Sequence, residues 1–258
     1  QLVETSATAH HHGFDVEVIQ CVGHTVEQHA VIGDDFFCLV GLATAALLLS
    51  SLAIAPGASL STADSAQAAT LSASSALNQL PVKGRAPKTG YARELFSDGW
   101  GSIGQCDLRN YILKRDLKNL TWRDSPDCTV ATGTLKDPYT GKVINFVRGV
   151  GSSLAVQIDH VVAVSDAWQK GAQQLSAQAR YSFYNDPLNL LAVDGPTNSQ
   201  KSDSDAASWL PPNKSFRCQY VARQVSVKRK YKLWVTSAEK AAIQAVLSSC
   251  PNQKLLSK

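Results

Sequence analysis

An uncharged apolar run over residues 36–55 sets the first limit on what this chain can fold into. Its length is enough to span a bilayer as a helix. A core helix of this length would normally show a polar face, and this run has only Thr44, Ser50 and Ser51. We expect residues 36–56 to be a hydrophobic segment that is either a signal peptide or a retained membrane anchor, with residues 66–68 as a candidate cleavage site.

The charged residues divide the chain in the same region. All 25 Lys and Arg residues lie from Lys83 onward, whereas the first 68 residues hold seven of the 21 Asp and Glu residues and five of the six His residues. The rest of the chain therefore has a net charge of +11. This charge predicts a polyanionic partner, and nucleic acid is the first candidate. The composition excludes a disordered chain and a multi-spanning membrane protein.

The chain divides into four parts. We assign no fold to residues 1–35, which precede the hydrophobic segment 36–56. Residues 57–79 are rich in Ala, Ser and Thr and are expected to form a linker. Residues 80–258 are expected to form one folded domain, which is long enough for a hydrophobic core.

Four cysteines follow the apolar run: Cys106, Cys128, Cys218 and Cys250. They show no C-x-x-C metal spacing, and their number is even, so two disulfides in an exported domain are expected. Sequence order favours the pairs Cys106–Cys128 and Cys218–Cys250. The alternative is four free thiols in a cytosolic protein. We expect a protein that is secreted, or anchored in the membrane with its domain outside the cytoplasm.

Local patterns predict a mixture of helices and strands. Asp107 can cap a helix over residues 108–117, and residues 129–135 and 142–147 form a hairpin pattern around a Pro-Gly turn. Two further β-type stretches follow at residues 154–162 and 187–193. Thr197 is then expected to cap a helix toward Trp209.

The last 40 residues predict an αα-hairpin. Its first helix is expected to begin near Cys218, and its second at Thr236. Glu239 lies three residues after Thr236, which is the pattern of a capping box.

The candidate site centres on His160, the sole histidine after residue 68. Asp159 precedes it on a predicted strand, where neighbouring side chains point to opposite faces. Both can therefore reach one site only where the strand ends or bulges. The next strand carries Asn189, and a turn leads to a helix start with Asn198 and Lys201. This strand–strand–helix order suits a site that holds one divalent cation against a phosphodiester.

Four segments carry a resemblance to the HNH endonuclease family: GRAPKTGYARELF, CDLRNYILKRDL, IDHVVAVSDAW and FYNDPLNLLAVDGPTNSQKSD. The chain resembles in particular secreted actinobacterial proteins with a domain of the C-terminal GmrSD restriction endonuclease type. The resemblance covers about two thirds of the chain. It implies an α+β fold with a ββα-metal core, flanking helices, a β-hairpin and the C-terminal αα-hairpin.

The resemblance also implies roles for the site residues. His160 would be the general base that activates water. Asp159 and Asn198 would bind one Mg²⁺ or Mn²⁺ ion through oxygen. Asn189 would orient the His160 imidazole, and Lys201 could contact a phosphate. Because Asn198 stands where the family often has a second histidine, zinc and nickel are disfavoured.

DNA is the expected substrate, and RNA stays open, since a phosphate-directed metal site does not exclude it. Residues expected to bind the nucleic-acid backbone are Arg109, Arg180, Lys228, Arg229 and Lys230. No base-reading motif is visible, so little sequence specificity is expected. We expect a monomer without a small-molecule cofactor. The alternative is a non-catalytic basic envelope module that binds nucleic acid.

Overall fold

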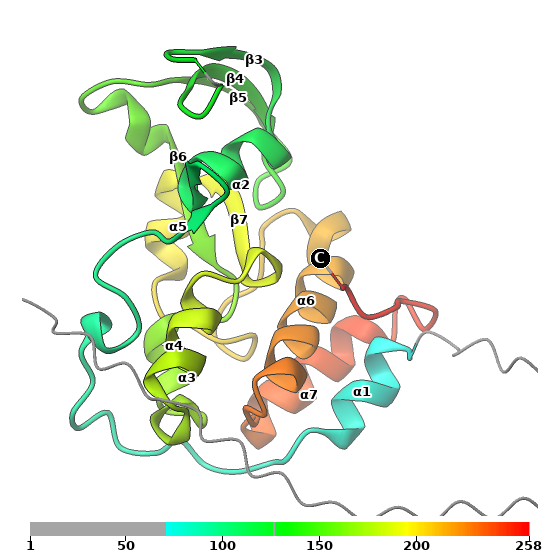
Figure 1. Cartoon of the computed structure of the whole chain (residues 1–258). Helices are drawn as coiled ribbons and strands as arrows, with labels where there is room; N and C mark the ends of the chain where they lie inside the picture. Colours follow the sequence, from blue (N-terminus) through cyan, green and yellow to red (C-terminus); the bar gives the residue numbers. More distant parts are fainter. Residues whose placement is uncertain (1–70, 126, 258) are drawn as a thin grey trace, which may run out of the picture. The chain divides into compact units, whose positions relative to one another are not determined.

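The computed structural model describes residues 71–125 and 127–257 (Figure 1). The predictions for residues 1–35 and for the hydrophobic segment 36–56 lie outside these ranges. Within them, no helix is both long and apolar enough to cross a membrane. The described residues all belong to one compact unit.

The domain mixes helices with short antiparallel strands, which confirms the α+β class. The helices are α1 (Ala73–Gln79), α2 (Leu108–Asp116), α3 (Val164–Trp168), α4 (Ala177–Tyr184), α5 (Gly195–Lys201), α6 (Arg217–Lys230) and α7 (Ser237–Leu247). The strands are β1 (Ser102–Ile103), β2 (Cys106–Asp107), β3 (Lys118–Trp122), β4 (Val130–Lys136), β5 (Val143–Val147), β6 (Val156–His160) and β7 (Leu190–Asp194).

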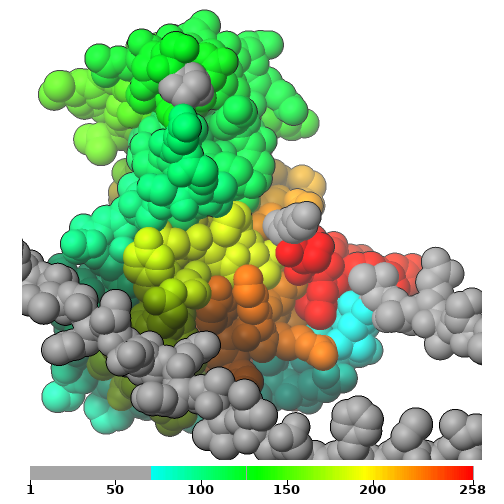
Figure 2. Space-filling model, viewed as in Figure 1, coloured from blue at the N-terminus to red at the C-terminus, as the bar shows by residue number. Residues whose placement is uncertain are grey.

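The strands form three small sheets. β1 pairs with β2, β3–β4–β5 form a three-stranded sheet, and β6 pairs with β7. The predicted hairpin is confirmed as β4 and β5, which pair from Thr132–Val147 to Lys136–Val143. Its turn is closed by the Asp137 carboxylate, which accepts from the Thr140 backbone N–H. In Figures 1 and 2 this sheet forms a projection above the helical part.

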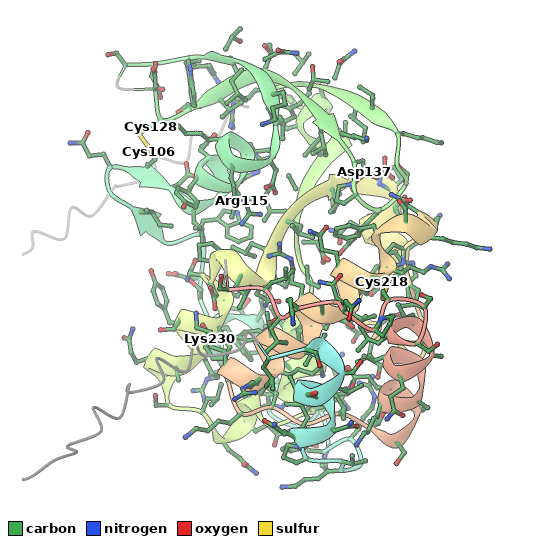
Figure 3. The ribbon with its side chains drawn as sticks, turned by 90° about the vertical axis from the view of Figure 1, so that its right-hand side faces the viewer. Cys106, Arg115, Cys128, Asp137, Cys218 and Lys230 are labelled. Atoms are coloured by element: carbon green, nitrogen blue, oxygen red, sulfur yellow. A yellow bond between two sulfur atoms is a disulfide. The ribbon has the colours of Figure 1, made fainter. Side chains whose placement is uncertain are left out.

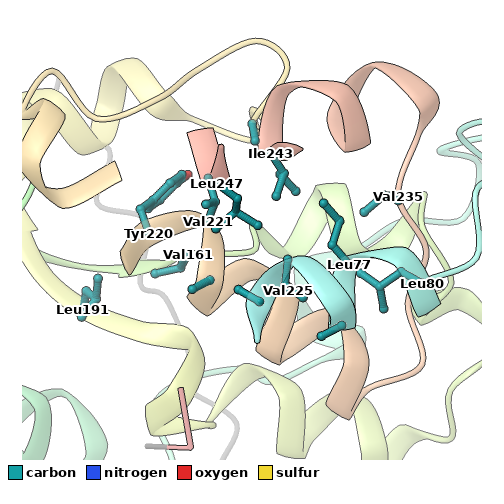
Figure 4. Packing of buried hydrophobic residues seen from close by; sticks show 14 of the residues in the cluster. Leu77, Leu80, Val161, Leu191, Tyr220, Val221, Val225, Val235, Ile243 and Leu247 are labelled. Carbon is teal, nitrogen blue, oxygen red and sulfur yellow. The ribbon is translucent and has the colours of Figure 1, made fainter. Parts of the chain in front are cut away.

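Helices α1, α6 and α7 pack together around the largest core cluster (Figure 4). Leu77 of α1 is fully buried, as are Val221 and Val225 of α6 and Ile243 of α7. Part of the stretch expected to be a linker is thus helical and belongs to the core. The small side chains on the inner face of α1 let it approach its neighbours closely, so an Ala/Ser-rich composition does not prevent packing here.

The C-terminal αα-hairpin and both disulfides are confirmed. Thr236 and Glu239 form the predicted capping box at the start of α7. Cys218 is bonded to Cys250, which ties the start of α6 to the segment after α7. Cys106 is bonded to Cys128, which ties β2 to the segment before β4 (Figure 3).

The helix after β7 differs from its prediction. Asp194 caps it, accepting from the Thr197 backbone N–H, so Thr197 lies inside the first turn. The helix ends at Lys201, because Ser202 takes a positive φ of 52° and turns the chain. This short α5 contacts both β6 and β7, which places its last turn against the end of β6.

Candidate functional site

The end of β6, the strand that carries Asp159 and His160, lines a pocket of about 310 Å³. β6 ends at His160, and both His160 and Asp159 line the pocket although they are neighbours on the strand. Asn198 of α5 lines it too. Three of the predicted site residues therefore meet in one place.

His160 is held by Tyr184 and Trp100. Its Nε2 lies 2.8 Å from the Tyr184 carbonyl oxygen, and Trp100 stacks on the ring at 5.7 Å with an interplanar angle of 10°. Burial lowers the pKa of His160 to about 3, and the charge of Arg93 is the second largest cause of this shift. The imidazole is therefore neutral at neutral pH. Because Nε2 donates to a carbonyl, which cannot donate, the lone pair is assigned to Nδ1.

Asp159 is fixed from two sides. The Tyr139 hydroxyl donates to Oδ2, and Lys201 Nζ donates to Oδ1 at 2.9 Å. Burial, and next the charge of Asp159, raise the pKa of Tyr139 well above 10.0, so its phenol stays protonated and acts as the donor. The carboxylate is thereby held in one orientation.

Lys201 does not occupy an exposed position where a phosphate could reach it. It is fully buried, and its Nζ also donates to the His160 carbonyl oxygen at 3.0 Å. Lys201 is the last residue of α5, and its bonds to Asp159 and His160 direct its side chain to the end of β6 rather than to solvent. In this structure Lys201 is a buried residue that holds the Asp159 side chain and the His160 backbone in place.

The two asparagines differ in their positions. Asn198 Nδ2 donates to Gln157 Oε1 at 2.9 Å, and the residue is partly exposed at the pocket. Asn189 is fully buried, and its side-chain amide bonds both the N–H and the carbonyl of Val162. Asn189 thus joins the segment after β6 to the turn before β7. The expectation that its side chain orients the His160 ring is wrong, because Tyr184 and Trp100 do this.

The residues present fit one hard divalent cation. Asp159 and Asn198 both line the pocket and offer oxygen donors. A carboxylate has about four acceptor sites, of which Tyr139 and Lys201 use two. In the part of the chain that the structure describes, no three His, Cys, Asp or Glu side chains cluster as a metal site. A small ligand set of this kind is typical of Mg²⁺, which keeps several waters and uses substrate phosphate oxygens.

Lys228, expected to bind nucleic acid, is instead buried in an ion-pair cluster. Its Nζ lies 2.9 Å from Glu239 of α7 and 3.6 Å from Asp166 of α3. Lys170 shares both acids and also pairs with Asp205 at 2.6 Å. Sequence spacing could not show that Lys228 lies on the inner face of α6.

The other four predicted backbone-binding residues lie outside the pocket. Arg180 donates to the carbonyls of Leu95 and Leu175, and half-buried Arg109 lies near the Val156 carbonyl. Arg229 and Lys230 are exposed near the end of α6. Lys230, labelled in Figure 3, pairs with Asp186. Nucleic-acid binding by Arg229 and Lys230 remains a prediction. Arg109 and Arg180 have structural partners that account for them.

Sequence reasoning missed several pocket residues: Tyr91, Arg93, Ser165, Ser202 and Asp203. Tyr91 and Arg93 belong to the segment GRAPKTGYARELF, which carried part of the resemblance, yet nothing in that segment showed that it reaches His160. No sequence signal marked Trp100 as a partner of His160. The aromatic support of His160 could be found only from the structure.

These features define a class: a disulfide-linked α+β domain whose antiparallel β6–β7 pair and α5 bring Asp159, His160 and Asn198 to one pocket. Residues 107–246, more than half of the chain, match the family described as GmrSD restriction endonucleases, C-terminal domain. The chain belongs to this family.

A curated relative adds a second comparison. The chain is 37% identical over 180 residues to an uncharacterized secreted protein of Arthroderma benhamiae, covering 69% of this chain and 84% of the relative. No solved structure matches the chain. The likeness to actinobacterial proteins and the assignment to the HNH group stay predictions.

Proposed function

We propose that this domain is an exported, metal-dependent endonuclease of the HNH type that hydrolyses DNA phosphodiester bonds with little sequence specificity. The observation that carries this proposal is the meeting of Asp159, His160 and Asn198 at one pocket, in a domain of a restriction-endonuclease family. The order β6, β7, α5 supports a ββα-metal core.

In this proposal His160 is the general base. The imidazole would take a proton from the attacking water at Nδ1, while Nε2 stays bonded to the Tyr184 carbonyl. Trp100 limits rotation of the ring. Asp159 and Asn198 would hold one Mg²⁺ or Mn²⁺. When bound, such an ion would stabilise the charge that develops on the phosphate and the leaving oxygen.

Two observations support export. The domain carries two disulfides, which persist in oxidising compartments. The relative from Arthroderma benhamiae is named a secreted protein. A hydrophobic segment at residues 36–56 would serve as the export signal.

Charge supports a nucleic-acid substrate. The chain after residue 68 has a net charge of +11, which favours association with a phosphate backbone. The direct test incubates the purified, oxidised protein with supercoiled plasmid and Mg²⁺ or Mn²⁺, with EDTA and His160→Ala controls. The proposal predicts nicking that requires the metal and disappears in the variant. If the folded protein binds DNA without cleaving it, a non-catalytic binding module is favoured. The same assay with an RNA substrate tests whether RNA is cleaved as well.

A further inference from the structure

Arg93 enters the pocket on a turn whose position is fixed by the aromatic core. It begins the 3₁₀ helix Arg93–Leu95, which is followed by buried Phe96. Phe96 packs against Phe183 and Trp168 with ring centroids 5.9 and 6.2 Å apart. Tyr91 packs on Trp168 as well, at 6.0 Å. The backbone on both sides of Arg93 is therefore anchored, while Arg93 itself is exposed and lines the pocket.

The Arg93 side chain is oriented by Tyr184. Its Nε donates to the Tyr184 hydroxyl at 3.3 Å, and its Cζ lies 5.0 Å from the centroid of the same ring. A guanidinium over an aromatic face is stabilised by the ring quadrupole. This contact fixes the side chain while leaving its charge uncompensated.

The other positively charged side chains near the pocket have acidic partners. Lys88 pairs with Asp203 at 3.2 Å, and Lys201 with Asp159 at 2.9 Å. For Arg93, no ion pair is found within residues 71–125 and 127–257, nor any hydrogen bond from its two terminal nitrogens. Arg93 is also the one Lys or Arg among the described residues that line this pocket. A guanidinium whose two terminal nitrogens have no other partner can donate two parallel hydrogen bonds to the oxygens of a phosphate.

We propose that Arg93 binds the non-bridging oxygens of the scissile phosphodiester and that Tyr184 positions it for this contact. The inference rests on the proposed nuclease function and adds a substrate-binding residue to it. Tyr184 accepts from His160 through its backbone carbonyl and holds Arg93 through its ring and hydroxyl. One residue therefore sets the placement of both the base and the phosphate-binding group.

The contact would act on the transition state. Water oxygen forms a bond to phosphorus, its proton passes to His160, and the bond to the leaving oxygen breaks with its electron pair, which takes a proton from solvent. Negative charge builds on the non-bridging oxygens as water attacks. Arg93 takes no part in the proton transfer and stabilises that charge, as fixed donors in a site do.

The test compares Arg93→Ala, Arg93→Lys and Tyr184→Phe with the wild-type full chain in plasmid cleavage. Arg123→Ala is the matched control, because Arg123 is exposed and lies outside the pocket. Arg93→Ala should lower kcat/KM by on the order of 10- to 100-fold, mainly through kcat. Arg93→Lys should recover part of the loss, and it keeps the test usable if the alanine variant is unstable. Tyr184→Phe keeps the carbonyl, so it should lower the rate without moving the pH profile.

A binding series separates this inference from the nuclease proposal. Affinity for a fluorescent duplex is measured against salt in EDTA, where no metal-dependent cleavage occurs. Removing one phosphate contact should reduce the slope of log K against log salt by about one for Arg93→Ala and not for Arg123→Ala. If Arg93→Ala behaves like Arg123→Ala in both the cleavage and the binding assay, the inference about Arg93 is overturned, and the proposed nuclease function is unaffected. If the wild type does not cleave, the nuclease proposal fails, and the salt slope alone supports or overturns the Arg93 contact.

Discussion

Lys201 Nζ lies 2.9 Å from Asp159 Oδ1, and the two side chains are 0% and 6% exposed. The pair links the last turn of α5 to the end of β6. The orientation of the proposed metal ligand therefore depends on a buried lysine. Any cation bound by Asp159 would share its carboxylate with this ammonium group.

Replacing Lys201 with Met should destabilise the domain. The change leaves the Asp159 carboxylate buried without its charged partner, a loss that typically costs about 3–5 kcal/mol in the free energy of unfolding. Added Mg²⁺ should raise the Tm of the variant more than that of the wild type, because the ion supplies the missing positive charge. Urea and thermal unfolding with and without Mg²⁺ measure both effects. Lys142→Met, on the exposed hairpin turn, is the control. Equal stability of the two variants would contradict the role assigned to the pair.

Acid should affect stability through His160. Its pKa in the folded protein is about 3, below the ordinary 6.5 of an unfolded histidine. Between these values the unfolded chain binds a proton that the folded chain does not, so this group lowers stability as pH falls from 6.5 toward 3. At pH values below about 3, where the full difference between the two pKa values is expressed, the effect is on the order of 5 kcal/mol. Urea unfolding at several pH values should show a smaller decline for His160→Gln, and identical pH dependence of the two proteins would refute the depressed pKa.

Lys228 should contribute to stability and not to DNA affinity. Lys228→Met leaves Glu239 and Asp166 short of positive charge in the interior, so unfolding should become easier by about 3–5 kcal/mol. The neighbouring exposed substitution Arg229→Met should change stability by less than about 0.5 kcal/mol. Chemical unfolding and duplex binding of both variants provide the comparison. Weaker DNA binding by folded Lys228→Met at unchanged stability would instead support a direct contact between Lys228 and DNA.

The disulfide between Cys218 and Cys250 should stabilise the αα-hairpin. It closes a separation of 32 residues, for which chain entropy predicts a contribution of roughly 3–4 kcal/mol. The double variant Cys218→Ser, Cys250→Ser should lose stability by this amount under oxidising conditions. In the wild type, a reductant should lower the urea midpoint, and the double variant should respond less. A wild type insensitive to reductant would contradict the prediction.

Local signals in the sequence predicted much of the fold. The Asp107 cap, the β4–β5 hairpin and the Thr236–Glu239 capping box were all recognisable, because each depends on residues within a few positions of one another. The disulfide pairs followed from sequence order. Asp159, His160 and Asn198 meet as the sequence pattern suggested.

Tertiary contacts explain what the sequence did not show. Whether Lys201 and Lys228 face solvent depends on which face of α5 and α6 is buried, and their acidic partners come from distant segments. The support of His160 comes partly from a backbone carbonyl, that of Tyr184, which no residue type reveals. Arg93 reaches the pocket from nearly 70 positions upstream of His160.

Chemical rescue tests the central claim most directly. Single-turnover cleavage of a labelled duplex in Mg²⁺ is measured for the wild type and for His160→Gly, with and without added imidazole. If His160 is the general base, the variant should lose about 10²- to 10⁴-fold in rate, and imidazole should restore part of it in a concentration-dependent way. Metal-dependent cleavage by His160→Gly at the wild-type rate would contradict the assignment of His160 and the site built around it.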